Sequence, residues 1–240
     1  WSSVVCSSDL PDVPQTAMSA IGQFDVTATA LQMAMVGAGI AAVYRSDGSG
    51  TNFLFTTYLS QVSPAFKENI GAATSVEWPA GIGAKGNEGV AGMTTQTDGA
   101  IGYVEYAFAK QNKMTYINLI NADGKTVEPK ASAFQAAAAG ADWANAKGYY
   151  LVLTNQPGAD SWPITGASFI LVYRQPQNPG AGSDALKFFA WAYKNGGKMA
   201  DELDYVPMPG NVVSLVEKTW GEIRSEEHTS ELQSRLHLVC

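Results

Sequence analysis

A short apolar run, a polar loop and a helix-like segment follow one another in the stretch GIAAVYRSDGSGTNFLFTTYL, residues 39–59. Residues 39–44 have the length and apolar content of a buried strand. Apolar side chains in residues 51–59 recur at helical spacing, and Pro64 is expected to stop that helix. The stretch therefore predicts a strand, an exposed loop and a helix, in that order.

Strand-like and helix-like segments alternate along the rest of the chain. Further strands are predicted at residues 74–78, 101–106, 116–120, 148–153 and 167–174. Further helices are predicted at residues 87–95, 131–139, 184–194 and about 212–220, the third of them capped by Ser183. This alternation is typical of an α/β protein.

The charge balance and the apolar runs exclude two classes of protein. The 240 residues carry a formal net charge of -7, which gives no electrostatic footprint for nucleic acid and repels anionic membranes. The apolar run at residues 30–43 is too short to span a bilayer and contains Gln32 and two glycines. No Lys or Arg precedes Arg45, so the sequence shows no secretion signal.

Histidine and cysteine occur only near the two ends of the chain, at Cys6, His228, His237 and Cys240. The body of the chain therefore lacks the residues of Ser-His-Asp and Cys-His nucleophilic sites, and it lacks the usual zinc ligands. Its carboxylates are scattered, with no EF-hand spacing. We expect a binding protein rather than an enzyme, with no metal and no cofactor.

The loop at residues 45–51, Arg-Ser-Asp-Gly-Ser-Gly-Thr, has the parts of an oxyanion site. It precedes a helix N-terminus, whose free backbone N–H groups and partial positive charge favour anions. Its two glycines allow close approach of a ligand, and Arg45 offers a planar fork of donors that Asp47 can orient. The spacing alone equally fits a capped helix after a charged turn.

Several segments resemble one known family in the order in which they occur. Residues 45–53, RSDGSGTNF, resemble the phosphate-contacting segment of the periplasmic phosphate-binding proteins of ABC transporters. Resemblance to the same family continues at residues 78–91, 99–107, 140–143, 161–165 and 186–193. It covers the chain from about Gly39 to Ile223.

The resemblance implies roles for five residues of the loop. Arg45, Ser49, Gly50 and Thr51 are expected to contact phosphate, and Asp47 is expected to support the arginine. The family's other ligands are a Thr-Phe pair, a Ser and an Asp that accepts the proton of phosphate. None of these has a counterpart here, so the residues that would select phosphate over sulfate are missing.

The resemblance also implies partners and a location. The expected ligand is inorganic phosphate, and the expected partner is an ABC transporter permease in the inner membrane. The family implies a monomer in the periplasm, without nucleic acid and without insertion into the membrane.

The implied fold is a truncated, two-lobed periplasmic-binding-protein fold of type II. Residues 39–165 would form an incomplete second lobe, and residues 166–223 a crossover strand and the C-terminal helices of the first lobe. Without the first lobe's sheet these helices would expose apolar faces, at a cost of several kcal/mol, comparable to the net stability of a domain.

The two ends of the chain do not match the family. Residues 1–38 are unmatched, and the origin of residues 11–38 stays open. Residues 1–10 and the tail at 224–240 resemble translated sequencing-adapter read-through, and we exclude them from the fold prediction as one excludes a tag. The alternative for the tail is an ordinary disordered end with a helical stretch.

Other interpretations remain open. Residues 81–86, Gly-Ile-Gly-Ala-Lys-Gly, match a dinucleotide-binding pattern with Glu105 at a suitable distance, but Trp78-Pro79 interrupts the strand that this pattern needs. The anion loop could instead serve a phosphoryl-handling enzyme, or the chain could be an inert assembly chimera. The aromatic side chains of residues 188–193 are expected to be core plus surface, and Glu202 and Asp204 a solvated face.

Overall fold

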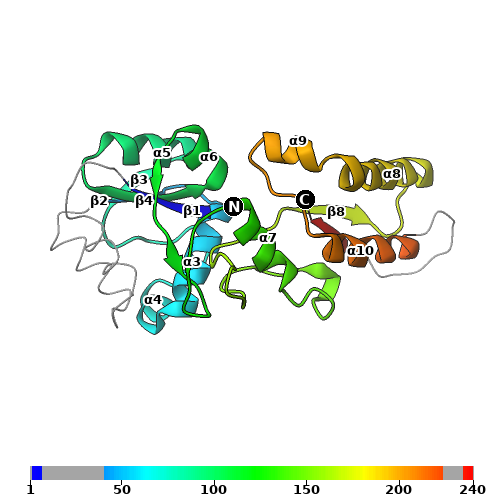
Figure 1. The fold of residues 1–240 in the computed structure, drawn as a ribbon, viewed down its shortest axis with the longest axis horizontal. Helices are drawn as coiled ribbons and strands as arrows, with labels where there is room; N and C mark the ends of the chain where they lie inside the picture. The colour runs from blue at the N-terminus through cyan, green and yellow to red at the C-terminus, as the bar shows by residue number, and fades with distance from the viewer. Residues whose placement is uncertain (1, 7–40, 224–234, 240) are drawn as a thin grey trace.

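A computed structural model describes residues 2–6, 41–223 and 235–239 (Figure 1). The expectations for residues 7–40 and 224–234 lie outside the described residues. Within the described ranges, the elements form a larger α/β part around one sheet and a smaller part made of C-terminal helices and a strand pair.

The main sheet has five strands in the order β3-β2-β4-β1-β5. The strands are β1 (Ser2–Cys6), β2 (Ala41–Arg45), β3 (Ile82–Ala84), β4 (Ala100–Glu105) and β5 (Thr115–Tyr116). β2 runs parallel to both β3 and β4, whereas β1 is antiparallel to β4 and β5. Because parallel strands end at the same edge, the carboxyl ends of β2, β3 and β4 lie together.

Helices cover both faces of this sheet. In Figure 1, α5 (Gly86–Gln96) and α6 (Tyr106–Gln111) lie above it, and α3 (Gly50–Val62) and α4 (Pro64–Asn69) lie below it. Val43, Val90 and Val104 are fully buried between the sheet and the upper helices. An added Cβ at Gly102 would lie 2.5 Å from Thr94 Oγ1, so only glycine lets α5 pack this closely on β4.

Two further apolar clusters extend the core toward the C-terminal elements. The first packs Phe134 of α7 (Ala131–Ala139) and Trp162 against α3 and the strand pair β6 (Leu119–Ile120) and β7 (Thr126–Val127). The second joins Trp143 and Leu153 to Val212 and Val216 of α10 (Gly210–Thr219). The second cluster thus draws on residues from both sides of position 165, and the predicted lobe boundary there stays a prediction.

The remaining elements complete the smaller part of the molecule. They are the 3-10 turns η1 (Lys147–Tyr149) and η2 (Trp220–Glu222), the strands β8 (Phe169–Tyr173) and β9 (Arg235–Val239), and the helices α8 (Pro179–Asn195) and α9 (Gly197–Glu202). β8 and β9 pair antiparallel as a separate two-stranded sheet. Within the described ranges, no helix has the length and apolar content needed to cross a bilayer.

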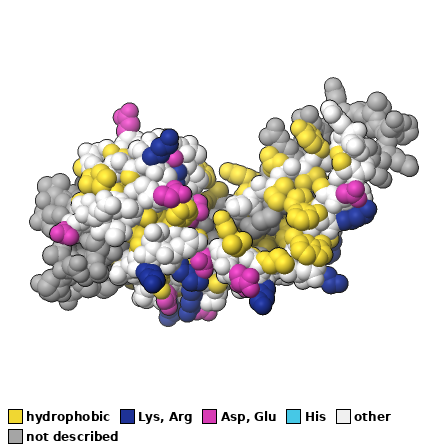
Figure 2. Space-filling view, turned by 90° about the horizontal axis from the view of Figure 1, so that it is seen from above, with side chains coloured by type: hydrophobic (Ala, Val, Ile, Leu, Met, Phe, Trp, Pro, Cys, Tyr) yellow, Lys and Arg dark blue, Asp and Glu magenta, His cyan; other side chains and the backbone are white. Residues whose placement is uncertain are grey.

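Large apolar side chains are exposed on this smaller part, as predicted for helices that lack a sheet to cover them. Phe188 and Trp191 of α8 are 59% and 49% exposed and stack on each other with ring centroids 6.2 Å apart. Leu171 and Tyr173 of β8 are also exposed. Figure 2 shows hydrophobic side chains gathered on the right-hand part of the molecule, where Figure 1 places these elements.

The two faces of α8 differ in their packing, in agreement with the core-plus-surface expectation for the aromatic side chains of residues 188–193. Phe189 and Tyr193 pack against the C-terminal cluster, and Phe188 and Trp191 lie on the opposite face. The predicted start of this helix was wrong. Asn178 caps it by accepting a hydrogen bond from the backbone N–H of Ala181 at 3.2 Å, so the helix begins well before Ser183.

The strand predicted at residues 74–78 is absent, and β3 lies further along at Ile82–Ala84. The carbonyls just before Trp78 are used elsewhere: Thr74 accepts from the backbone N–H of Ser49 at 2.9 Å, and Ala73 accepts from the Asn52 amide at 3.1 Å. The segment therefore supports the loop after β2 instead of joining the sheet.

Two other strand predictions were also wrong. Gly148 and Tyr149 have φ of 61° and 56°, which no strand allows, so residues 148–153 begin in a 3-10 turn. The strand predicted at 116–120 is divided between β5, which pairs with β1, and β6, which pairs with β7. Residues 121–125 connect β6 to β7.

Both ends that we excluded from the fold prediction contribute a strand, β1 and β9, and the helical stretch considered for the tail is not what residues 235–239 form. Without β1 and β9, strands β4 and β8 would present unpaired backbone N–H and C=O groups, which accept a further strand with little regard to its sequence. Pairing of this kind leaves the adapter-like origin of the two ends a prediction.

The exposed aromatic face predicts how substitutions in α8 behave. Replacing Phe188 and Trp191 by Gln should reduce aggregation and the binding of a hydrophobic dye to this face. Each substitution should change the free energy of unfolding by less than about 0.5 kcal/mol. The matched control Phe189→Ala, on the packed face, should destabilise by about 2 kcal/mol or more. Light scattering and chemical denaturation measure both effects, and equal destabilisation on the two faces would contradict the assignment.

Candidate anion site

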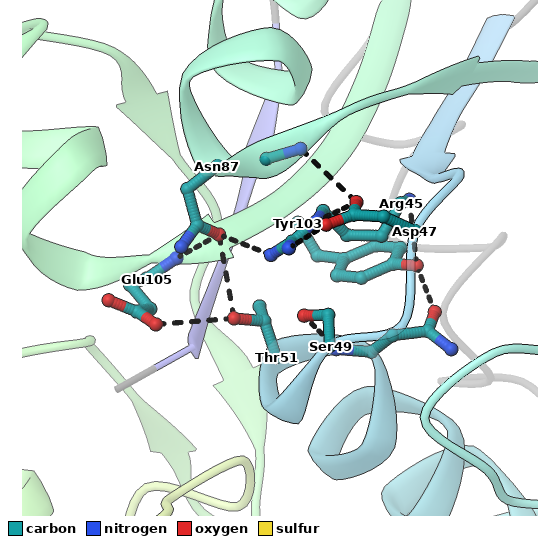
Figure 3. A network of polar contacts seen from close by, with 9 residues as sticks. Arg45, Asp47, Ser49, Thr51, Asn87, Tyr103 and Glu105 are labelled. Carbon is teal, nitrogen blue, oxygen red and sulfur yellow. Dashed lines mark hydrogen bonds and ion pairs between the residues drawn. The ribbon is translucent and has the colours of Figure 1, made fainter.

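The loop between β2 and α3 lies at the carboxyl edge of the parallel strands (Figure 3). β2 ends at Arg45, and the chain reaches the first turn of α3 at Gly50. Ser49 is the N-cap residue of α3: its backbone is extended, and its Oγ accepts a hydrogen bond from the backbone N–H of Asn52 at 3.2 Å. The predicted strand, loop and helix are therefore all present.

Arg45 and Asp47 form a bidentate ion pair. Arg45 Nε donates to Asp47 Oδ1 at 2.8 Å, and Nη2 donates to Oδ2 at 2.7 Å. The backbone N–H of Gly86 also donates to Asp47 Oδ1, at 3.1 Å. These bonds use one edge of the guanidinium and leave an N–H on each terminal nitrogen pointing away from Asp47.

The ion pair shifts the pKa of both partners. The hydrogen bond from Arg45, and after it the one from Gly86, holds the pKa of the Asp47 carboxyl well below its usual range. The hydrogen bond to Asp47 raises the pKa of Arg45, and Glu105 adds a smaller electrostatic contribution in the same direction. The guanidinium is therefore charged and held in one orientation.

The helix N-terminus supplies donors beside this pair. Ser49, whose oxygen already accepts from the backbone, keeps its hydroxyl proton free to donate. The first N–H groups of α3, at Gly50 and Thr51, have no acceptor among the described residues, as expected for a first helical turn. An added Cβ at Gly50 would meet nothing within 4 Å, so space remains in front of that backbone.

Three polar residues of the network were not predicted as site residues. Asn87 Oδ1 accepts from Arg45 Nη1 at 3.3 Å and lies 3.5 Å from Thr51 Oγ1. Glu105 Oε1 accepts from the same Thr51 hydroxyl at 3.4 Å. Tyr103 receives a hydrogen bond from the backbone N–H of Arg45 at 3.2 Å and donates its hydroxyl to the Asn52 side chain.

These residues are distant in sequence, and only the sheet brings them together. Tyr103 and Glu105 lie at the end of β4, and Asn87 opens α5. The one available signal was the resemblance of residues 78–91 and 99–107 to the same family. That resemblance did not say which of their side chains face the loop.

The arrangement gathers hydrogen-bond donors around one point without a large net positive charge. The Arg45 guanidinium is paired with the Asp47 carboxylate, and the Glu105 carboxylate, which accepts from Thr51, adds a smaller electrostatic contribution. Attraction for an anion must come from the free guanidinium edge, the hydroxyl groups and the start of α3. Such a set suits a tetrahedral oxyanion, whose oxygens accept several hydrogen bonds at once.

The described residues include no group of three His, Cys, Asp or Glu side chains able to hold a metal ion. The glycine segment at residues 81–86 does not form a loop whose backbone N–H groups are available to a dinucleotide phosphate. Gly81 packs its backbone close to β2, and the N–H of Gly86 is used by Asp47. The segment thus supports the anion loop.

A family model described as a PBP superfamily domain matches residues 24–195. The chain belongs to the PBP superfamily. The predicted α/β class and solute-binding fold are thereby confirmed.

Relatives within the superfamily have high sequence identity to this chain. The phosphate-binding protein PstS of Xylella fastidiosa (strain 9a5c) is 52% identical over 181 residues, which are 75% of this chain and 50% of that protein. PstS of Haemophilus influenzae is 49% identical over 181 residues, covering 75% of this chain and 54% of that protein. The chain thus spans about half the length of the curated relatives it matches.

Solved structures share the fold of this superfamily member. The crystal structure of a DING protein aligns with a TM-score of 0.55 at 18% identity, covering 91% of this chain and 67% of that chain. A human phosphate binding apolipoprotein aligns with a TM-score of 0.54 at 18% identity and the same coverage.

The ion pair predicts the titration of Asp47. Its pKa is lower in the folded chain than the value of about 3.9 for a free Asp, so its stabilising effect is complete above about pH 4. That effect is lost as the pH falls through the lowered value. In a carbon NMR titration, Arg45→Ala should move the Asp47 carboxyl midpoint up toward the ordinary range; the same midpoint in both forms would contradict the pairing.

Gly86 predicts a second, conformational effect. Its φ of +74° lies in the left-handed region, so Gly86→Ala should destabilise by about 1–2 kcal/mol and displace the N–H that Asp47 accepts. The matched control is Gly92→Ala in the interior of α5, where an added Cβ meets nothing within 4 Å, and it should stabilise by about 0.5–1 kcal/mol. Chemical denaturation that ranks the two variants in the opposite order would refute this.

Proposed function

We propose that this chain is part of a phosphate-binding protein and that Arg45, Ser49, Gly50 and Thr51 contact the phosphate. The observation that carries the proposal is the oriented guanidinium beside the backbone N–H groups of Gly50 and Thr51, which have no acceptor among the described residues. Relatives that are 48–52% identical to this chain are named phosphate-binding proteins, which supports phosphate as the ligand. The chain matches about half of the length of each of them. Asp47 acts as the residue that orients Arg45.

In the whole protein, we propose that bound phosphate is delivered to an ABC transporter permease for import, from the periplasm and without catalysis. PstS proteins are the relatives named, and one structural neighbour is titled a high affinity periplasmic phosphate-binding protein. A phosphoryl-handling enzyme would need a general base, and residues 39–223 lack His, the side chain most often used, while Asp47 at the site is paired with Arg45.

The two lobes of the proposed fold would close over the ligand, and this chain supplies one wall of the site. Residues 39–165 would provide that wall, and residues 166–223 would return to the other lobe. A half-enclosed anion keeps much of its water, so each hydrogen bond from the protein replaces one from solvent and adds little net affinity. Weak binding by this chain is expected, with poor discrimination between phosphate and sulfate.

Phosphate binding is the direct test of this function. The chain should bind inorganic phosphate with a dissociation constant above the micromolar range, measured by phosphorus NMR titration. Arg45→Ala should weaken it about 10- to 100-fold, because bonds to a charged donor are lost. The matched control Arg174→Ala removes a guanidinium from the segment after β8 and should leave the affinity unchanged. Absence of binding, or equal loss in both variants, would refute the proposal.

A further inference from the structure

The glycine segment at residues 81–86 ends in a turn that contacts the loop at residues 45–51. Gly86 has a φ of +74°, and its N–H reaches Asp47 Oδ1 at 3.1 Å. The next residue, Asn87, is 9% exposed and projects from the first turn of α5 into the same network (Figure 3). The turn therefore delivers two consecutive polar groups to the loop after β2.

Two N–H groups and one hydroxyl group, from three different elements, converge on one oxygen of Asn87. Arg45 Nη1 at the end of β2 lies 3.3 Å from Oδ1, Thr51 Oγ1 in the first turn of α3 lies 3.5 Å away, and the backbone N–H of Glu105 at the end of β4 lies 3.4 Å away. Since backbone and guanidinium nitrogens only donate, the amide oxygen and not the nitrogen must face them. Asn87 thus joins β2, α3 and β4 at their ligand-facing ends.

The Asn87 side chain does not cap its own helix. The N-cap position of α5 is Lys85, and Asn87 lies two residues further along, inside the first turn. Here α5 has no side-chain cap, and the Asn87 oxygen is directed to the loop instead. The amide oxygen of Asn87 lies within hydrogen-bond distance of Arg45 and Thr51, two residues that the proposed function assigns to the anion.

We propose that Asn87 is a positioning residue of the anion site, which sets the separation between Arg45 and Thr51. This inference rests on the proposed function. Asp47 fixes one edge of the guanidinium, and Asn87 fixes the end of Nη1, so the remaining N–H groups face one direction. Holding donors in place before the ligand arrives lowers the ordering cost of binding.

A ligand-free measurement tests the positioning directly. The Arg45 guanidinium gives a nitrogen NMR signal whose proton exchange is slow when the side chain is held, and Arg45→Lys identifies that signal. Asn87→Ala should speed this exchange about tenfold. Asn87→Asp keeps an acceptor oxygen in the same place and should restore slow exchange. Unchanged exchange in Asn87→Ala would overturn the proposal whether or not the chain binds phosphate.

A second measurement couples Asn87 to the ligand through a double-mutant cycle on phosphate affinity. Asn87→Ala alone should weaken phosphate binding about tenfold, by analogy with residues that orient the metal-binding side chains of metal sites through hydrogen bonds. When Asn87→Ala is combined with Thr51→Val, the total loss of affinity should be smaller than the product of the two separate losses by about threefold or more. Both substitutions disturb the same contact. Combined with Ser49→Ala, whose hydroxyl has no hydrogen bond to Asn87, the losses should multiply within a factor of about two.

The outcomes separate this inference from the proposed function. In one outcome, phosphate binding needs Arg45 while the losses of affinity simply multiply in both double-mutant cycles. That result would overturn the positioning role of Asn87 and leave the proposed function standing. No binding by the unsubstituted chain would overturn the proposed function, and the exchange measurement would then still decide whether Asn87 holds Arg45.

Discussion

The candidate site depends on the bidentate ion pair between Arg45 and Asp47. An anion approaching this guanidinium meets an unfavourable setting, because the net charge of the chain is -7 and the guanidinium is already paired with the Asp47 carboxylate. Asp47 uses one edge of the fork and so determines where the other edge points. In the proposed function, an anion would be attracted at short range by aligned donors and a helix start, against the long-range field of the protein.

The sheet explains why these donors meet. β2, β3 and β4 are parallel, so Arg45, the turn after Ala84 and Glu105 all lie at one edge. Close packing of α5 on β4, which Gly102 permits, brings Asn87 against the loop. The segment before Trp78 gives up sheet pairing and binds the start of α3 through its carbonyls. Fold and site thus share the same contacts.

Local pattern was sufficient for the anion loop and insufficient for what surrounds it. The strand, the loop and the helix start are neighbours in sequence, so their chemistry could be predicted from residues 39–59. Asn87 and Tyr103 contact the loop from 42 and 58 residues away, and no local pattern encodes such a contact. The strand predicted at 74–78 failed for a related reason, because the carbonyl of Thr74 and that of Ala73 just before it bond to the distant residues Ser49 and Asn52. The exposed aromatics of α8 were foreseen because the resemblance implied a missing sheet.

A backbone amide NMR titration shows whether phosphate binds at the start of α3, as proposed. As inorganic phosphate is added, the largest saturable shifts should occur at the amides of Gly50 and Thr51, which have no acceptor among the described residues. The amides of residues 81–84 should move little. Shifts that centre on residues 81–84, or no saturable shift at Gly50 and Thr51, would contradict the account.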